Sequence, residues 1–89
     1  MTTTTATAAA PLTQSDIDEA CINVLNVVID HCNVIRRDYR WTRSGDASHR
    51  HEFSLRDFEV NFIPRCSVVV AAGARALIAE ARAEAAKVF

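Results

Sequence analysis

The sequence predicts a small, mainly α-helical (α+β) protein, and three observations support that fold class. The longest apolar segment, residues 13–37, has polar residues at alternating steps of three and four, which is the period of an α-helix. Residues 64–88 are rich in alanine, the residue with the highest helix propensity. Between these segments, residues 39–53 alternate with a period of two around a turn-like stretch, which is typical of a β-hairpin.

The first helix is predicted over residues 13–37, and Thr13 with Asp16 forms a capping pattern at its start. A strand of this length would be far longer than usual, and the polar residues never alternate by two. They form one narrow stripe, made of Glu19, Asn23, Asn26, Asp30, Asn33 and Arg37. Because nearly every other side chain is apolar, we expect this helix to be covered from two or three sides and the chain to be a homo-oligomer. The residues expected in the oligomer interface are Ile17, Cys21, Val24, Val28 and Ile35.

A small β-hairpin is predicted over residues 39–53, with the turn-forming residues 44–48 as its loop. Folding this segment symmetrically about Asp46 gives three cross-strand pairs, namely Tyr39 with Phe53, Trp41 with His51, and Arg40 with Glu52. Two of these pairs contain aromatic rings on one face and the third is an ion pair on the other face, which favours this register.

A short second helix and a long third helix are predicted beyond the hairpin. The run Ser54–Asp57 has the pattern of a capping box, and the helix that it begins extends to about Ile63. Pro64 breaks this helix, because the residue before a proline avoids the α conformation, and it suits the first turn of the next helix. The third helix, residues 64–88, is roughly 36 Å long and matches the first in length. We therefore expect these two helices to pack antiparallel, with the hairpin and the short helix across one end.

A single helical domain, residues 13–89, is expected from a chain of 89 residues. Residues 1–12, mostly threonine and alanine, are predicted to form a disordered tail. The net charge of −1 gives no general attraction to nucleic acid or to a membrane, and no apolar run has the length of a membrane span. The odd number of cysteines in apolar patterns predicts reduced thiols and a reducing, cytoplasmic location; the three are Cys21, Cys32 and Cys66.

Catalytic and metal chemistry are both disfavoured by the sequence. A zinc site needs about four converging ligands, whereas His31 and Cys32 diverge by about 100° on a helix, and the pair His49 and His51 lies elsewhere. The cysteines lie in apolar patterns, which raise thiol pKa values and reduce reactivity. We therefore predict that the protein is not an enzyme and that it holds no metal and no cofactor.

The arginine-rich segment that begins at Arg36 is the best candidate for a contact surface. Arginine binds phosphates and carboxylates through two parallel hydrogen bonds, stacks on aromatic rings, and is frequent in protein–protein hot spots. The alternative is that the aromatic rings face the core and the arginines are only solvated. The residues predicted to bind a partner are Arg36, Arg37, Tyr39, Arg40, Trp41, Arg43, Arg50 and Arg56.

The segment Leu12–Asp18, which opens the first helix, resembles the start of the small helical proteins by which phages block bacterial defence. The resemblance covers seven residues and assigns no role to any of them. The function expected from the sequence is a protein–protein interaction module, as an adaptor, an inhibitor or a small subunit of a larger complex, whose partner is a protein or a nucleoprotein. Direct binding of nucleic acid or of a phosphorylated small ligand, such as a nucleotide, is the alternative.

Overall fold

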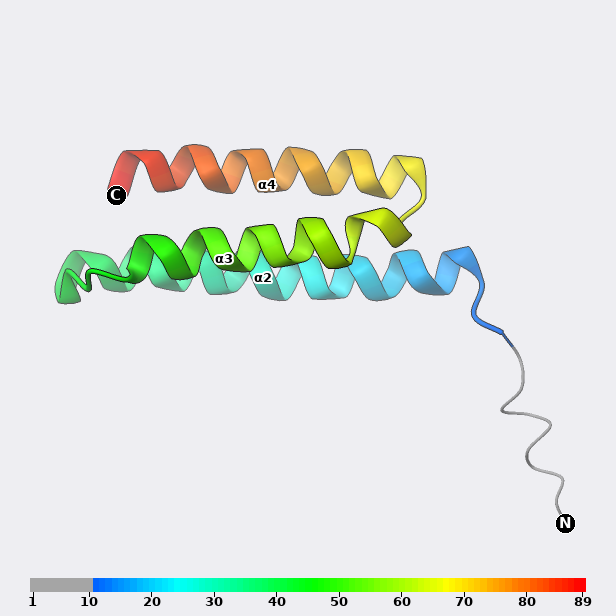
Figure 1. The fold of residues 1–89 in the computed structure, drawn as a ribbon, viewed down its shortest axis with the longest axis horizontal. Helices are drawn as coiled ribbons and strands as arrows, with labels where there is room; N and C mark the ends of the chain where they lie inside the picture. Colours follow the sequence, from blue (N-terminus) through cyan, green and yellow to red (C-terminus); the bar gives the residue numbers. More distant parts are fainter. Residues whose placement is uncertain (1–10) are drawn as a thin grey trace, which may run out of the picture.

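The computed structural model describes residues 11–89, and these residues form three α-helices and one short 3₁₀ turn (Figure 1). The elements are α2 (Gln14–Thr42), α3 (Ala47–Asn61), η1 (Ile63–Arg65) and α4 (Val68–Val88). The prediction of a mainly α protein is confirmed. Of the predicted disordered tail, only Pro11 and Leu12 are described, and both precede α2; residues 1–10 lie outside the described part of the chain.

Helix α2 begins as the sequence predicts and ends later than predicted. The Thr13 side chain accepts a hydrogen bond from the Asp16 backbone N–H at 3.1 Å, and the Asp16 carboxylate accepts one from the Thr13 N–H at 3.1 Å. The six residues of the predicted polar stripe are all exposed to solvent. The helix continues to Thr42 and ends at Arg43, whose φ of 51° lies in the left-handed region that often terminates helices.

The predicted β-hairpin is wrong, because no strand is present in residues 11–89. Residues 39–42 form the last turn of α2, and residues 47–53 form the first turns of α3. The sequence spacing that decides this outcome is helical, since Ala47, His51, Leu55 and Phe58 recur at steps of four and three and are all buried. A period of two over only five residues could not outweigh this longer apolar face, which continues through the predicted short helix.

The three predicted cross-strand pairs are therefore absent from the described structure. Tyr39 contacts Phe89 instead, with ring centroids 5.0 Å apart, and Phe53 is exposed. Glu52 is bound by Arg82 rather than by Arg40. His51 is buried, whereas Trp41 lies in solvent.

The predicted antiparallel packing of the first and last helices is also wrong, because α2 and α4 run in parallel (Figure 1). Near the starts of the two helices, the Ser67 N–H donates a hydrogen bond to the Asp18 carboxylate at 2.9 Å. At the opposite end Tyr39 lies against Phe89. Since α3 is a full helix rather than a compact hairpin, it carries the chain back to the start of α2, and α4 must then run in the same direction as α2.

The core lies where the three helices meet, and α4 contributes mostly small side chains to it. Phe58 is the largest fully buried side chain, and its ring stacks on Phe62 with centroids 5.2 Å apart. Helix α4 begins at Val68 after the Ser67 cap, four residues later than predicted, because Pro64 lies in the 3₁₀ turn η1. The main buried residues are Cys21, Leu25 and Cys32 from α2, Leu55 and Phe58 from α3, Ile63 from η1, and Ala71, Ala74, Ile78 and Ala81 from α4.

Candidate functional site

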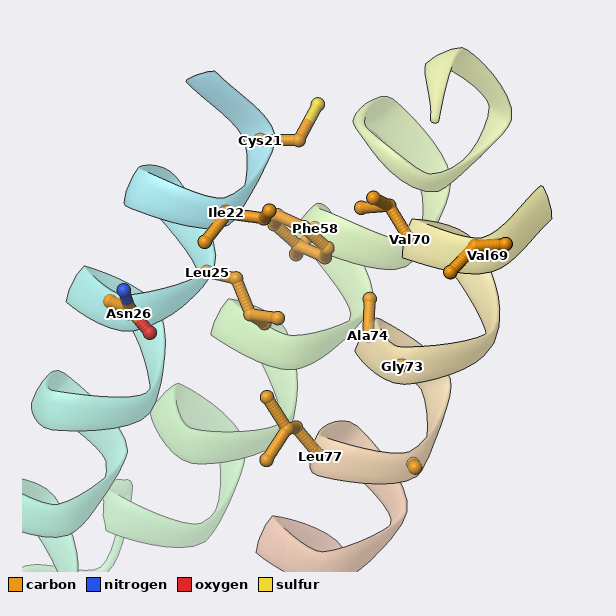
Figure 2. A pocket seen from close by; sticks show the side chains of 11 residues that line it. Cys21, Ile22, Leu25, Asn26, Phe58, Val69, Val70, Gly73, Ala74 and Leu77 are labelled. Atoms are coloured by element: carbon orange, nitrogen blue, oxygen red, sulfur yellow. The ribbon is translucent and has the colours of Figure 1, made fainter. Parts of the chain in front are cut away.

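An apolar groove with a volume of about 500 Å³ lies between the N-terminal halves of α2 and α4 (Figure 2). Phe58 of α3 lies between the two helices, with Ile22 and Leu25 of α2 on one side and Val70 of α4 on the other. Asn26 is the one lining side chain with a polar amide. The lining residues are Cys21, Ile22, Leu25, Asn26, Phe58, Val69, Val70, Gly73, Ala74, Ala76 and Leu77.

The local sequence of α4 explains why this groove stays open. Gly73 faces it without a side chain, and a Cβ atom placed there would meet no atom within 4 Å. Large apolar side chains flank this gap, with Val69 81% exposed, Ile22 43% exposed and Leu77 41% exposed. Single exposed apolar residues are common on proteins, but several around one concave surface mark a contact site. Folding of this chain therefore leaves an apolar surface in water.

The groove is the first part of a longer depression that we call the α2/α4 seam, which extends along α2 from Cys21 to Arg40. The next hollow, about 340 Å³, shares Leu77 with the groove and contains Arg36, Glu80 and Glu84. The last hollow, about 250 Å³, shares Arg36 and Glu84 with the second. At 1.5 Å per residue the seam is roughly 28 Å long. Its character changes along this length, from apolar at the start of the helices to arginine-rich at their ends.

Three of the residues predicted to bind a partner line the last hollow together, and we call Arg36, Arg37 and Arg40 the arginine end of the seam. Arg36 donates hydrogen bonds to Nε2 of His51 at 2.7 Å and to the side chain of Asn33. Arg37 lies 3.7 Å from the carboxylate of Asp38, with both side chains well exposed. Arg40 forms no ion pair within residues 11–89.

The other predicted partner-binding residues do not form one patch with these three. Tyr39 is half-buried, and the guanidinium of Arg43 lies 5.4 Å from the centre of its ring. Trp41 is 84% exposed on the last turn of α2. Arg50 pairs with Asp46 at 3.5 Å at the start of α3. Arg56 is exposed further along α3, so the predicted arginine-rich loop is in fact distributed over two helices and their connection.

The predicted oligomer interface of α2 faces the other helices of the same chain. Cys21 and Ile35 are buried, and Ile17, Val24 and Val28 are half-buried against the core. The apolar residues that remain open at the groove are Ile22, Val69 and Leu77, none of which the sequence singled out as a site. Val69 could have been indicated by the run of three valines, residues 68–70, since a helix cannot bury all three against one neighbour.

His51 is a buried histidine whose ring is hydrogen-bonded to Arg36. Burial and the nearby charge of Arg36 lower its pKa, and the charge of Glu52 opposes them. Because Arg36 is always a donor, Nε2 of His51 accepts and the ring proton is on Nδ1. Phe89 covers the ring from one side, with centroids 5.6 Å apart. This arrangement holds the ends of the three helices together.

Two of the three thiols, those of Cys32 and Cys66, have raised pKa values, whereas a reactive cysteine has a lowered one. Burial raises the pKa of Cys32, and its Sγ lies 3.8 Å from the backbone oxygen of His51. Burial and the neighbouring thiol of Cys21 raise the pKa of Cys66 to about 11. All three cysteines are free. In the described part of the chain, no three His, Cys, Asp or Glu side chains converge as metal ligands would.

Within residues 11–89, none of the helices combines the length and the apolar character of a membrane span. Compared with protein-family models, with curated proteins and with solved structures, the chain gives no match.

Proposed function

We propose that this protein is a non-catalytic protein-interaction module that holds a helical segment of a partner protein in the α2/α4 seam. The observation that supports the proposal is the apolar groove at the start of the seam, where Ile22, Val69 and Leu77 remain in water around a floor that includes Phe58. A groove between two helices is the usual receptor for the apolar face of a third helix.

The energetic gain from filling this groove is substantial. Burying one large aliphatic side chain that was fully exposed contributes roughly 1.5–3 kcal/mol. Val69 starts almost fully exposed, and Ile22 and Leu77 start close to half exposed. A micromolar complex requires a net free energy of about −8 kcal/mol, so contacts along the rest of the seam must add to these three.

The proposal covers an adaptor, an inhibitor and a small subunit of a larger complex, since all three hold a partner without chemistry. A second copy of the chain is the competing occupant, and the expected homo-oligomer remains a prediction. Light scattering over a micromolar concentration range distinguishes these cases. We retain a reducing, cytoplasmic location as part of the proposal, because it would keep the three cysteines free.

Capture of the partner from the native host by the immobilised full chain tests the proposal. Leu77→Asp places a charge beside the apolar groove and should abolish capture of the partner that the unchanged chain retains. Val60→Asp is the matched control, because Val60 is 63% exposed on α3 and lines none of the hollows of the seam. Circular dichroism should show that both variants are folded. A partner captured equally by both variants would place the contact surface elsewhere.

Direct binding of nucleic acid or of a phosphorylated small ligand is the second candidate function. The observation that favours it is the arginine end, where three guanidinium groups line one hollow. Phosphate contacts predict a steep loss of affinity with salt, with a log–log slope of about −0.7 to −0.9 for each contact. A protein interface with an apolar centre predicts a shallow slope and capture that survives nuclease treatment.

A further inference from the structure

We propose that the partner segment is an amphipathic α-helix that lies antiparallel to α2 and α4, with apolar residues in the groove and carboxylates of its first turn on Arg37 and Arg40. This inference rests on the proposed function and adds the length, the charge and the direction of the segment. It follows from the change in chemistry along the α2/α4 seam and from the arrangement of the three helices.

The dimensions of the seam determine the kind of segment that fits. A depression of roughly 28 Å between two helices accommodates about five turns of a third helix. An extended segment would need the edge of a sheet for its backbone hydrogen bonds, and residues 11–89 contain no strand. A helix satisfies its own backbone and presents only side chains, so it matches a surface built from helices.

The charges along the seam determine the composition of the segment. The groove has no charged lining residue, so it takes apolar side chains. At the other end, Glu84 is the one acid that lines the hollow with Arg36, Arg37 and Arg40, and it is already bonded to Lys87 at 3.1 Å. Asp38 lies 3.7 Å from Arg37, in a pair exposed to solvent, so two acids stand against three arginines and a lysine. This end therefore carries a local excess of positive charge. Carboxylates are the complementary groups, because they pair with guanidinium through charge-assisted hydrogen bonds.

The helix directions determine which end of the segment carries the carboxylates. Helices α2 and α4 both end at the arginine end of the seam, and α3 starts there (Figure 1). A partner helix that also starts there places its positive dipole end beside the negative ends of α2 and α4. Acidic residues are favoured in the first turn of a helix for the same reason. The result is a four-helix arrangement with two helices running in each direction.

A second copy of this chain does not supply such a helix. Helices α3 and α4 have no acidic residue in their first turns. Helix α2 starts with acids, but Asp16 caps its own helix and Asp18 binds the Ser67 N–H. The apolar side of α2 is also occupied by the core of its own chain. The occupant that fits is therefore a helix from a different protein.

Binding of synthetic peptides to the full chain, measured by fluorescence anisotropy, tests the inference. One peptide of about 18 residues carries leucines at helical spacing and three glutamates in its first turn. A second has the glutamates in its last turn, and a third has lysines in place of the glutamates. We expect the first peptide to bind at least about tenfold more tightly than either of the others, because two or three ion pairs distinguish them.

Variants of the chain separate the two parts of the inference. Arg37→Ala combined with Arg40→Ala should reduce the affinity advantage of the first peptide over the other two to about twofold or less. Arg50→Ala, which changes an arginine away from the seam, should leave this advantage unchanged. Leu77→Asp should abolish binding of all three peptides, and Val69→Asp provides a second substitution at the same groove. Val60→Asp should bind as the unchanged chain does.

Four results would overturn the inference. Equal affinity for the three peptides would show that the seam does not distinguish the charge or the direction of the bound segment. If no peptide binds while Leu77→Asp still abolishes capture of the native partner, the chemistry assigned to the segment is wrong and the proposed function stands. A dimer that Leu77→Asp dissociates would show that a second copy fills the groove. If neither peptide binding nor partner capture responds to Leu77→Asp, the inference and the proposed function both fail.

Discussion

Helix α4 forms two seams with its neighbours, and they differ in chemistry. On the side of α3, Arg82 binds Glu52 through Nε and Nη2 at 3.0 and 2.7 Å. The same guanidinium binds Glu59 through Nη1 and Nη2 at 2.9 and 2.7 Å. On the side of α2, the first half of the seam is an unfilled apolar groove around Gly73.

The two seams distinguish contacts that stabilise the fold from surface that a partner can bind. The charged groups of the α3/α4 seam are paired within the chain, because a guanidinium bridging two carboxylates satisfies both of them and lowers the pKa of each. A hollow of about 290 Å³ beside Arg82 and Phe89 remains between these two helices. The α2/α4 seam is complete in its lower layer, where Phe58 and Ala74 are buried, and incomplete in its outer layer. Substitutions in the first seam and in the lower layer of the second should therefore affect folding, whereas substitutions in the outer layer should affect binding.

The largest expected effect is that of Phe58→Ala, which removes the ring beneath the groove. Deleting a buried phenylalanine side chain costs about 3–5 kcal/mol of unfolding free energy, and the stacking partner Phe62 loses its contact as well. Urea unfolding followed by circular dichroism measures the change. Phe53→Ala is the matched control, because Phe53 is 71% exposed on the same helix, and it should cost about 0.5 kcal/mol or less. Similar losses for both variants would contradict the assignment of the core.

The next effect is a loss of stability in mild acid that originates at His51. Its pKa is lowered from 6.5 in the folded chain, so the unfolded chain binds more protons below that pH. Stability should be complete above about pH 6.5 and should fall as the pH drops from there toward the lower folded pKa, by up to about 1.4 kcal/mol for each pH unit.

The contribution of His51 can be separated from that of the carboxylates. Glu52 and Glu59 have lowered pKa values, so their contribution is lost only as the pH falls below about 4.5, the ordinary value for glutamate. His51→Gln keeps an acceptor for Arg36 and should remove the pH dependence between pH 6.5 and 5. His49→Gln, an exposed histidine on the same helix, should retain it. Urea midpoints at several pH values give the comparison.

A smaller effect is expected for Arg82→Met, which keeps an unbranched apolar stem and removes the guanidinium group with its charge. The two carboxylates that it bridges then face each other without a cation. Since all three side chains are partly exposed, solvent screening limits the loss to about 1 kcal/mol, and added salt should reduce it further. A loss that does not respond to salt would show that the ion pairs of Arg82 are not the source of its contribution to stability.

The smallest effect on stability is expected in the outer layer of the α2/α4 seam. Val69→Ser should change the unfolding free energy by no more than about 0.5 kcal/mol, because Val69 is exposed and contributes little to the core. Differential scanning calorimetry measures it beside Arg82→Met. If Val69→Ser destabilises the chain as much as Arg82→Met does, the distinction between the two seams is lost.

The sequence is sufficient for the mainly α class and for the start of α2, and insufficient for the middle of the chain. The polar stripe from Glu19 to Arg37 covers several turns, so its period is unambiguous. Within residues 39–53, the period-two pattern is only a few residues long on each side of the turn. It competes there with the helical spacing of the buried residues Ala47, His51 and Leu55. The predicted direction of α4 is wrong for a topological reason. A full helix in place of the hairpin returns the chain to the start of α2, so the helix that follows runs in the opposite direction to the predicted one.

The candidate site was only partly accessible from the sequence. Arginine enrichment identifies Arg36, Arg37 and Arg40 directly, because charge composition needs no fold. The groove could not be predicted in the same way, since it exists only where the outer edges of α2 and α4 meet. Ile22, Leu77 and Gly73 become neighbours through the parallel packing of these helices, which is the feature that the sequence left undetermined.

The four-residue connection between α2 and α3, residues 43–46, favours pairing of these two helices as the first step of folding. Closing so short a loop costs little chain entropy, whereas α4 reaches α2 only across the whole of α3. We therefore expect the α2–α3 pair to form before α4 docks against it. The apolar side of α2 that later faces α4 is then uncovered for its whole length. The two-helix hairpin that forms first is therefore the stage at which we expect this chain to be most prone to aggregation.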